Sequence, residues 1–257
     1  MMKRLKLTQV MYLLFIACAI LINFDFILMA KSKPGSAIFV MSDNIYNDIY
    51  TTSKKHEYYS EYISLYQCTP QIRGLTDKNF QKSLNKQLVN ASKKNRNMMI
   101  DISKRYNQDI IKDKLSPTKF EYSENYCIIP SFKPYYNIAT FTYKYSGGAH
   151  GEGTVDYMVL NTETNTIVTL KDLFKPNIDY LNILNHQLEI QLTTLVNKSQ
   201  IPLYNTPNDI KLSNNQNFYI NNTGDIIIVF NVYEIAPYAS GIIEVLIPRT
   251  NISMYLK

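Results

Sequence analysis

The chain has 257 residues, of which 46% are hydrophobic and 19% charged, which suits one or two globular domains with a substantial apolar core. The formal net charge is +6, but from Lys31 onward only 24 basic residues stand against 20 acidic ones. A charge this small and scattered argues against nucleic-acid binding.

An uninterrupted apolar run over residues 10–22 follows three basic residues. With its continuation, residues 9–30 are long enough to span a bilayer, while the thirteen-residue run alone suits a signal peptide. We expect residues 1–30 to be an uncleaved single-pass anchor, with a cleaved signal and a secreted protein as the alternative. In both cases the basic flank stays inside and the rest of the chain is extracytoplasmic.

Residues 31–60 sustain no hydrophobic period, and we interpret them as a linker or stalk. A first α+β subdomain is expected over residues 61–135. It begins with a strand at 62–68 and continues into a long helix with Thr76 as its N-cap candidate. Apolar residues recur at three- and four-residue steps for about thirty residues of this helix, and a strand follows at 120–126.

A second α+β subdomain is expected over residues 136–257, with strands at 138–145, 155–160 and 166–170. A helix then carries one leucine stripe: Leu181, Leu184, Leu188, Leu192 and Leu195. Further strands follow at 216–220, 225–233 and 242–247, and the 225–233 strand is apolar on both faces at its centre, so it should be buried. The fold class is therefore α+β, with mostly antiparallel sheets that are each packed by a long helix.

A glycine-rich loop joins the strands at 138–145 and 155–160. Residues 145–153 hold four of the eight glycines of the chain: Gly147, Gly148, Gly151 and Gly153. Since glycine reaches positive φ without a Cβ penalty, the first interpretation is structural, with His150 as a local hydrogen-bonding side chain. The functional alternative is that exposed amides, His150 and Glu152 contact a ligand or partner.

The residues offer little for catalysis. His150 is the candidate general base, with Glu234 or Glu152 to orient it, but the favoured role for Glu234 is that of an internal hydrogen-bond acceptor. The sequence has only three histidines, no G-x-S-x-G nucleophile motif and no zinc-ligand set, so no metal or cofactor is expected. Cys68 and Cys127 follow the apolar segment; they are either two buried thiols or a disulfide.

Three strings resemble a known family: YKYSGGAHG at 143–151, LKDLF at 170–174 and YEIAPYASG at 233–241. They are similar to the exported module of RsiV-type lysozyme-sensing anti-sigma factors and PdaC-type peptidoglycan deacetylases, two domains of unknown function. PQIRGL at 70–75 and Asn85 resemble the first half of that module. Only about eight residues precede the apolar run and the chain ends at Lys257, so we expect neither a sigma-binding region nor a deacetylase domain.

The resemblance implies a non-catalytic, membrane-tethered recognition module of the cell envelope. Its expected partner is a lysozyme-like protein or peptidoglycan. The expected contact residues lie in two loops: Tyr145, Gly147, Gly148, His150 and Gly151 in the first, and Tyr233, Glu234, Tyr238 and Gly241 in the second. A cell-wall hydrolase that uses His150 is the alternative, and an anti-sigma sensor without its own cytoplasmic domain is a more remote one.

Overall fold

The computed structural model describes residues 49–257, which lie in one compact unit. The predicted anchor or signal at 1–30 and most of the predicted linker lie outside the described residues. Between residues 49 and 257, no helix combines the length and hydropathy that a membrane span requires.

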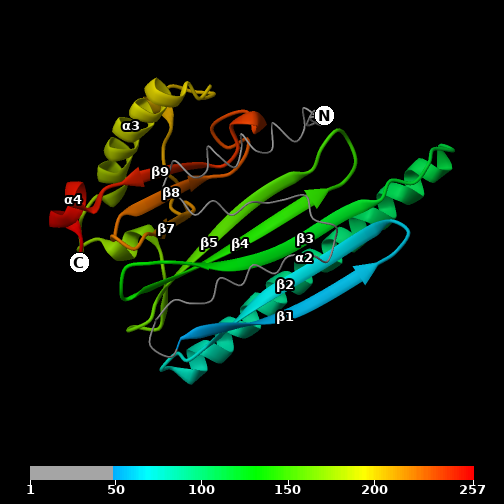
Figure 1. Ribbon diagram of the computed structural model, residues 1–257, viewed down its shortest axis with the longest axis horizontal. Coiled ribbons are helices and arrows are strands. Elements are labelled where there is room, and N and C mark those ends of the chain that lie inside the picture. Colours follow the sequence, from blue (N-terminus) through cyan, green and yellow to red (C-terminus); the bar gives the residue numbers. More distant parts are fainter. Residues whose placement is uncertain (1–48) are drawn as a thin grey trace, which may run out of the picture. The chain divides into compact units, whose positions relative to one another are not determined.

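Six strands form the first sheet in the order β1-β2-β3-β4-β5-β6 (Figure 1). Their bounds are Tyr50–Tyr59, Ile63–Arg73, Phe120–Ile129, Tyr135–Tyr145, Glu152–Asn161 and Thr166–Val168. All neighbours pair antiparallel except β2 and β3, which pair parallel. Helix α2 (Lys78–Lys112) connects these two strands, because parallel neighbours need a long crossover. The sheet is therefore mixed, with a single parallel pair, and the expectation of mostly antiparallel sheets is confirmed.

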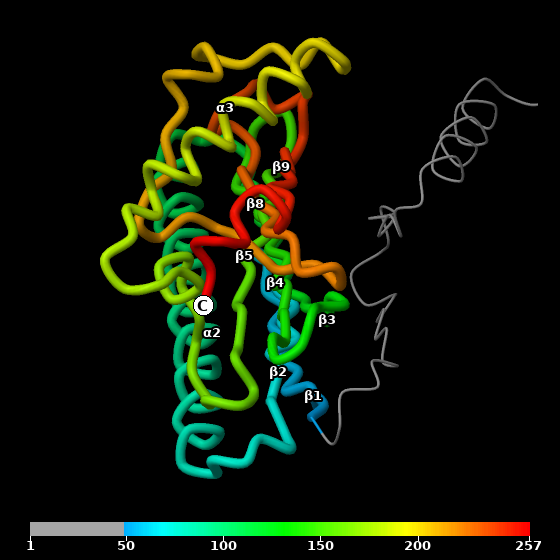
Figure 2. Tube along the Cα trace, turned by 90° about the vertical axis from the view of Figure 1, so that its left-hand side faces the viewer, coloured from blue at the N-terminus to red at the C-terminus, as the bar shows by residue number. Residues whose placement is uncertain are grey.

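Helix α2 lies along one face of the first sheet (Figure 2). It begins one residue later than predicted, since the carboxylate of Asp77 accepts hydrogen bonds from the amides of Asn79 and Phe80. Alternate residues of one strand point to opposite faces, so a single strand serves two cores. In β4, Ile138 packs in the core beneath α2, while its neighbour Ala139 packs in a core shared with the second sheet.

The second sheet has the order β7-β8-β9, with bounds Phe218–Ile220, Ile226–Phe230 and Ile243–Ile247. All five residues of β8 are buried, as its two apolar faces predict. Helix α3 (Tyr180–Ser199) contributes the fully buried Leu184, Leu188 and Leu192 to the same core, so the leucine stripe is confirmed as packing. A short helix, α4 (Arg249–Ile252), follows β9.

The LKDLF string forms a single 3-10 turn, η1 (Leu170–Leu173), at the start of the second half. The Asp172 carboxylate accepts hydrogen bonds from both the amide and the hydroxyl of Thr169, which caps the turn. Leu170, Leu173 and Phe174 are buried in the large core. This string is thus explained by capping and packing.

Two predicted boundaries differ from the structure. Residues 50–59 were assigned to the linker, but they form β1, which pairs with β2 along its whole length. The side chains of this edge strand are mostly exposed on both faces, so it lacks the hydrophobic period that sequence reading requires. The predicted border between residues 135 and 136 falls inside the first sheet, because β3 and β4 are adjacent paired strands.

Candidate binding site

The glycine-rich loop is the tip of the β4–β5 hairpin, where the last strand pair joins Lys144 to Glu152. Gly147 and Gly148 have φ values of +97° and +96°, and the Tyr145 hydroxyl donates to the Gly148 carbonyl across the turn at 3.1 Å. These torsions require glycine. They are the conformations expected from the structural interpretation of the loop.

Replacing Gly148 by alanine is expected to lower the free energy of unfolding by about 1–2 kcal/mol, because an L side chain is strained at positive φ. A Cβ at this position would meet no atom within 4 Å, so the cost would be purely conformational. Gly153 is a matched control: a Cβ there also meets nothing, and its φ is not positive. Urea unfolding of both variants tests the difference, and equal effects would contradict it.

The second loop connects β8 to β9 and is anchored at its start by Asn231. The Asn231 side chain accepts from the Val155 amide at 2.8 Å and donates to the Val155 carbonyl at 3.1 Å, which joins the loop to β5. Ile235 and Ala236 are buried, whereas Tyr233, at φ +68°, is 49% exposed. The loop therefore turns two side chains inward and leaves an aromatic ring outside.

The two predicted loops meet. The rings of His150 and Tyr238 stack with centroids 4.2 Å apart, and the Tyr238 hydroxyl donates to the Gly151 carbonyl at 3.0 Å. The Nδ1 atom of His150 lies 3.0 Å from the same carbonyl, so it must carry a proton to form this bond. Tyr233 lies beside Tyr238 with centroids 5.5 Å apart. We name His150, Tyr233 and Tyr238 the aromatic surface.

Carboxylates lie close to the aromatic surface. Burial raises the pKa of Glu234, the charge of Asp156 adds to that rise, and hydrogen bonds from Asn231 oppose it. Burial also raises the pKa of Asp156, and Lys144 opposes that shift. Glu152 is exposed beside the tip of the hairpin. Glu152, Asp156 and Glu234 are all exposed, so the rings are accompanied by acidic groups that a partner can reach.

Two family models match the chain. "Deacetylase PdaC" matches residues 52–152, and "Protein of unknown function (DUF3298)" matches residues 171–250. The chain carries this two-part module. The first matched segment holds His150 and the second holds Tyr233 and Tyr238, so the aromatic surface forms where the two parts of the module meet.

Solved structures agree with the module at the level of fold. A DUF3298 family member from Bacteroides fragilis is 18% identical, with a TM-score of 0.62 over 82% of this chain and 93% of that one. A DUF3298 family protein from Pseudomonas aeruginosa is 15% identical, with a TM-score of 0.52 over 81% and 94%. No curated protein matches the chain significantly.

The module does not assemble the acid–base pair considered from the sequence. Within residues 49–257, the only hydrogen-bond partner of the His150 ring is the Gly151 carbonyl, and neither Glu152 nor Glu234 bonds to it. The Glu234 backbone amide instead donates to the Asn231 carbonyl at 3.1 Å. In the same residues, no three His, Cys, Asp or Glu side chains are grouped as a metal site.

Cys68 in β2 and Cys127 in β3 are free and buried. The disulfide alternative is therefore not the arrangement found in the structure. Burial raises the pKa of the Cys127 thiol to about 12, so at neutral pH it is protonated and a poor nucleophile.

We expect neither Cys68 nor Cys127 to react with iodoacetamide in the native chain over minutes, because both are at most 8% exposed and Cys127 is held as the thiol. Both should be alkylated after unfolding in urea without a reducing agent. Peptide mass spectrometry after each treatment checks this. A pair that resists alkylation in urea until it is reduced would contradict the free-thiol state.

Sequence reading missed a set of asparagines that hydrogen-bond to backbone. Asn85 accepts from the Ile72 amide at 2.7 Å and donates to the Ile72 carbonyl at 2.9 Å, and Asn107 does the same for Thr118 at 2.7 and 2.9 Å. Asn217 bonds to the Tyr157 amide and the Val155 carbonyl of β5. Each side-chain amide thus supplies both a donor and an acceptor to backbone groups of a neighbouring segment. Only Asn85 had a signal, through the family resemblance.

Proposed function

We propose that the chain is a non-catalytic recognition module of the cell envelope that binds a protein partner through the aromatic surface. The observation that carries the proposal is the junction of the two loops. The Gly151 carbonyl accepts hydrogen bonds from both the Tyr238 hydroxyl and the His150 ring. This junction holds the rings of His150, Tyr233 and Tyr238 side by side at the surface.

Such a surface suits binding better than turnover. Tyrosine supplies a large contact area with few rotatable bonds, which is why it is enriched where proteins bind proteins. His150 Nδ1 is bonded to the Gly151 carbonyl, and no carboxylate among residues 49–257 orients the ring. A general base needs such an orienting partner and a place for substrate.

The partner is proposed to be a lysozyme-like protein, on the strength of the family resemblance. The nearby carboxylates Asp156, Glu152 and Glu234 would favour a partner whose contact face is positively charged. We further propose that residues 9–30 tether the module to the membrane with residues 49–257 on its outer side. Protease added to intact cells should then digest these residues.

Isothermal titration of the full chain with hen lysozyme tests the proposal, with soluble peptidoglycan fragments as a second titrant. We expect lysozyme to bind at micromolar concentration or tighter. Binding of the fragments alone would redirect the proposal to glycan recognition. Binding of neither titrant would remove the proposed function.

A further inference from the structure

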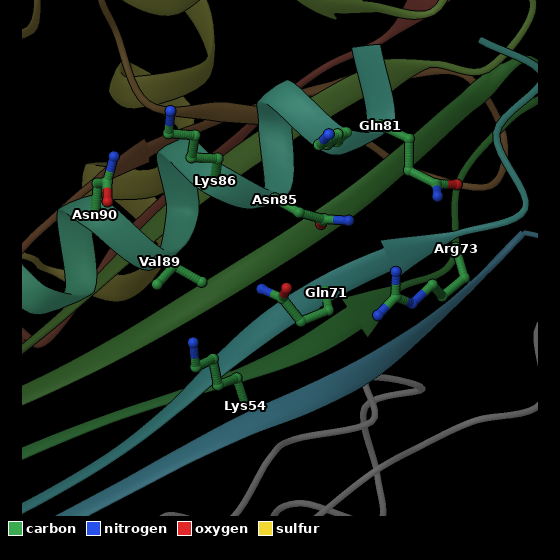
Figure 3. Close-up of a pocket in the computed structure, with 9 residues that line it drawn as sticks. Lys54, Gln71, Arg73, Gln81, Asn85, Lys86, Val89 and Asn90 are labelled. Atoms are coloured by element: carbon green, nitrogen blue, oxygen red, sulfur yellow. The ribbon is translucent and has the colours of Figure 1, made fainter. Parts of the chain in front are cut away.

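A second, separate feature is a polar pocket between β1, β2 and the first turns of α2 (Figure 3). Its volume is ≈380 Å³, within the range of small-molecule sites, which span about 300–1,000 Å³. Four cationic side chains line it: Lys54 from β1, Arg73 from β2, and Lys82 and Lys86 from α2. Among the described residues, no acidic side chain lines the pocket.

Within the part of the chain that the structure describes, no carboxylate pairs with the charges of this pocket. Between residues 49 and 257, the single salt bridge joins Lys112 and Asp109, so none of the four cations has a carboxylate partner there. Four like charges around one cavity repel one another, although all four residues are exposed and salt therefore screens part of this repulsion. An anion that enters the pocket relieves this repulsion.

The pocket is fixed in shape by hydrogen bonds that the ligand would not have to supply. Asn85 forms part of the pocket wall. Its side-chain amide hydrogen-bonds to both backbone groups of Ile72, which fixes α2 against β2. The Gln81 side-chain oxygen accepts a hydrogen bond from the Leu75 amide at 3.1 Å. The NH2 group of Gln81 is therefore the end of this side chain that can donate to a ligand. The wall therefore offers donors far more than acceptors.

We propose that this pocket binds a phosphate-bearing anion with a small polar organic part, such as a glycerol phosphate unit. Phosphate groups accept several charge-assisted hydrogen bonds, and arginine and lysine are the side chains that supply them. The volume leaves room beyond one phosphate group for hydroxyls, which can accept from the amide of Gln81. This site is independent of the aromatic surface and of its proposed partner.

The test titrates the full chain, held in nanodiscs of neutral lipid, with glycerol 3-phosphate, followed by calorimetry. The double variant Lys82→Gln/Lys86→Gln is expected to weaken binding at least about tenfold, since each charge-assisted hydrogen bond contributes on the order of a tenfold change. The matched control is Lys93→Gln/Lys94→Gln, which removes the same charge from exposed positions farther along α2 and should change affinity less than about twofold. Arg73→Gln should weaken binding independently of any change in the helix.

Two further arms identify the source of the phosphate. Monomeric short-chain phosphatidylglycerol that binds more tightly than glycerol 3-phosphate would indicate a lipid headgroup, and equal affinities would indicate a soluble or polymeric ester. Short-chain phosphatidylcholine, whose phosphate is neutralised, should bind more weakly than either. Absence of binding by every phosphate ester, or equal losses in both double variants, would overturn the proposal.

Discussion

Replacing Asn85 by alanine is expected to lower the free energy of unfolding by about 2–4 kcal/mol. The Ile72 amide and carbonyl both bond to the Asn85 side chain, and Ile72 is 0% exposed. Past Gln67, β2 no longer pairs with β3, so the sheet supplies no replacement partner on that edge. Each buried backbone group left unsatisfied costs about 1–3 kcal/mol.

Urea unfolding of the full chain, with the midpoint and the slope fitted together, measures this effect. Asn90→Ala is the matched control: the same substitution on the same helix at an exposed position, where alanine should be neutral or slightly stabilising. A loss at position 85 no larger than that at position 90 would show that the backbone clamp does not stabilise the fold.

Replacing Tyr238 by alanine is expected to weaken partner binding at least about 30-fold, the effect of a residue that contributes 2 kcal/mol or more to an interface. The substitution removes the ring that stacks on His150 and the hydroxyl that bonds to the Gly151 carbonyl, so both loops lose their common anchor. Tyr238→Phe keeps the stacking and loses only the hydrogen bond, and should cause an intermediate loss.

Tyr50→Ala is the control for surface tyrosine in general, since Tyr50 is 57% exposed on β1 and belongs to neither loop. Titration with lysozyme, together with an unfolding curve for each variant, separates lost contact from lost fold. Equal affinities for the wild-type chain and Tyr238→Ala would exclude the aromatic surface as the binding site.

The sequence was most informative where packing follows a simple period. The leucine stripe of α3 and the two apolar faces of β8 predicted elements that pack as expected. The apolar spacing in α2 predicted the helix but not all of its buried face, because Met98, Ile102 and Tyr106 are exposed while Met99, Ser103 and Asn107 are buried. Strand β1 was not predicted, because an edge strand whose two faces are both exposed has no hydrophobic period. The parallel pairing of β2 with β3 was not predicted, because the local sequence pattern does not show which strands become neighbours in the sheet.

The candidate site was predictable in its parts and not in its geometry. Positive φ at Gly147 and Gly148 follows from the clustering of glycines. That Tyr238 stacks on a ring 88 positions earlier depends on tertiary contacts between the two parts of the module. The polar pocket could not be predicted from residue spacing in the sequence. Lys54 and Arg73 lie close to Lys82 and Lys86 only because β1 pairs with β2 beside α2.

The proposed function depends on where a partner touches the chain. Hydrogen–deuterium exchange of the full chain, with and without lysozyme, locates that contact by peptide. We predict slower exchange in the 146–151 and 231–242 loops together, with little change in β1 and the exposed face of α2. Protection confined to any other region, or unchanged exchange in both loops while lysozyme is bound, would contradict recognition through the aromatic surface.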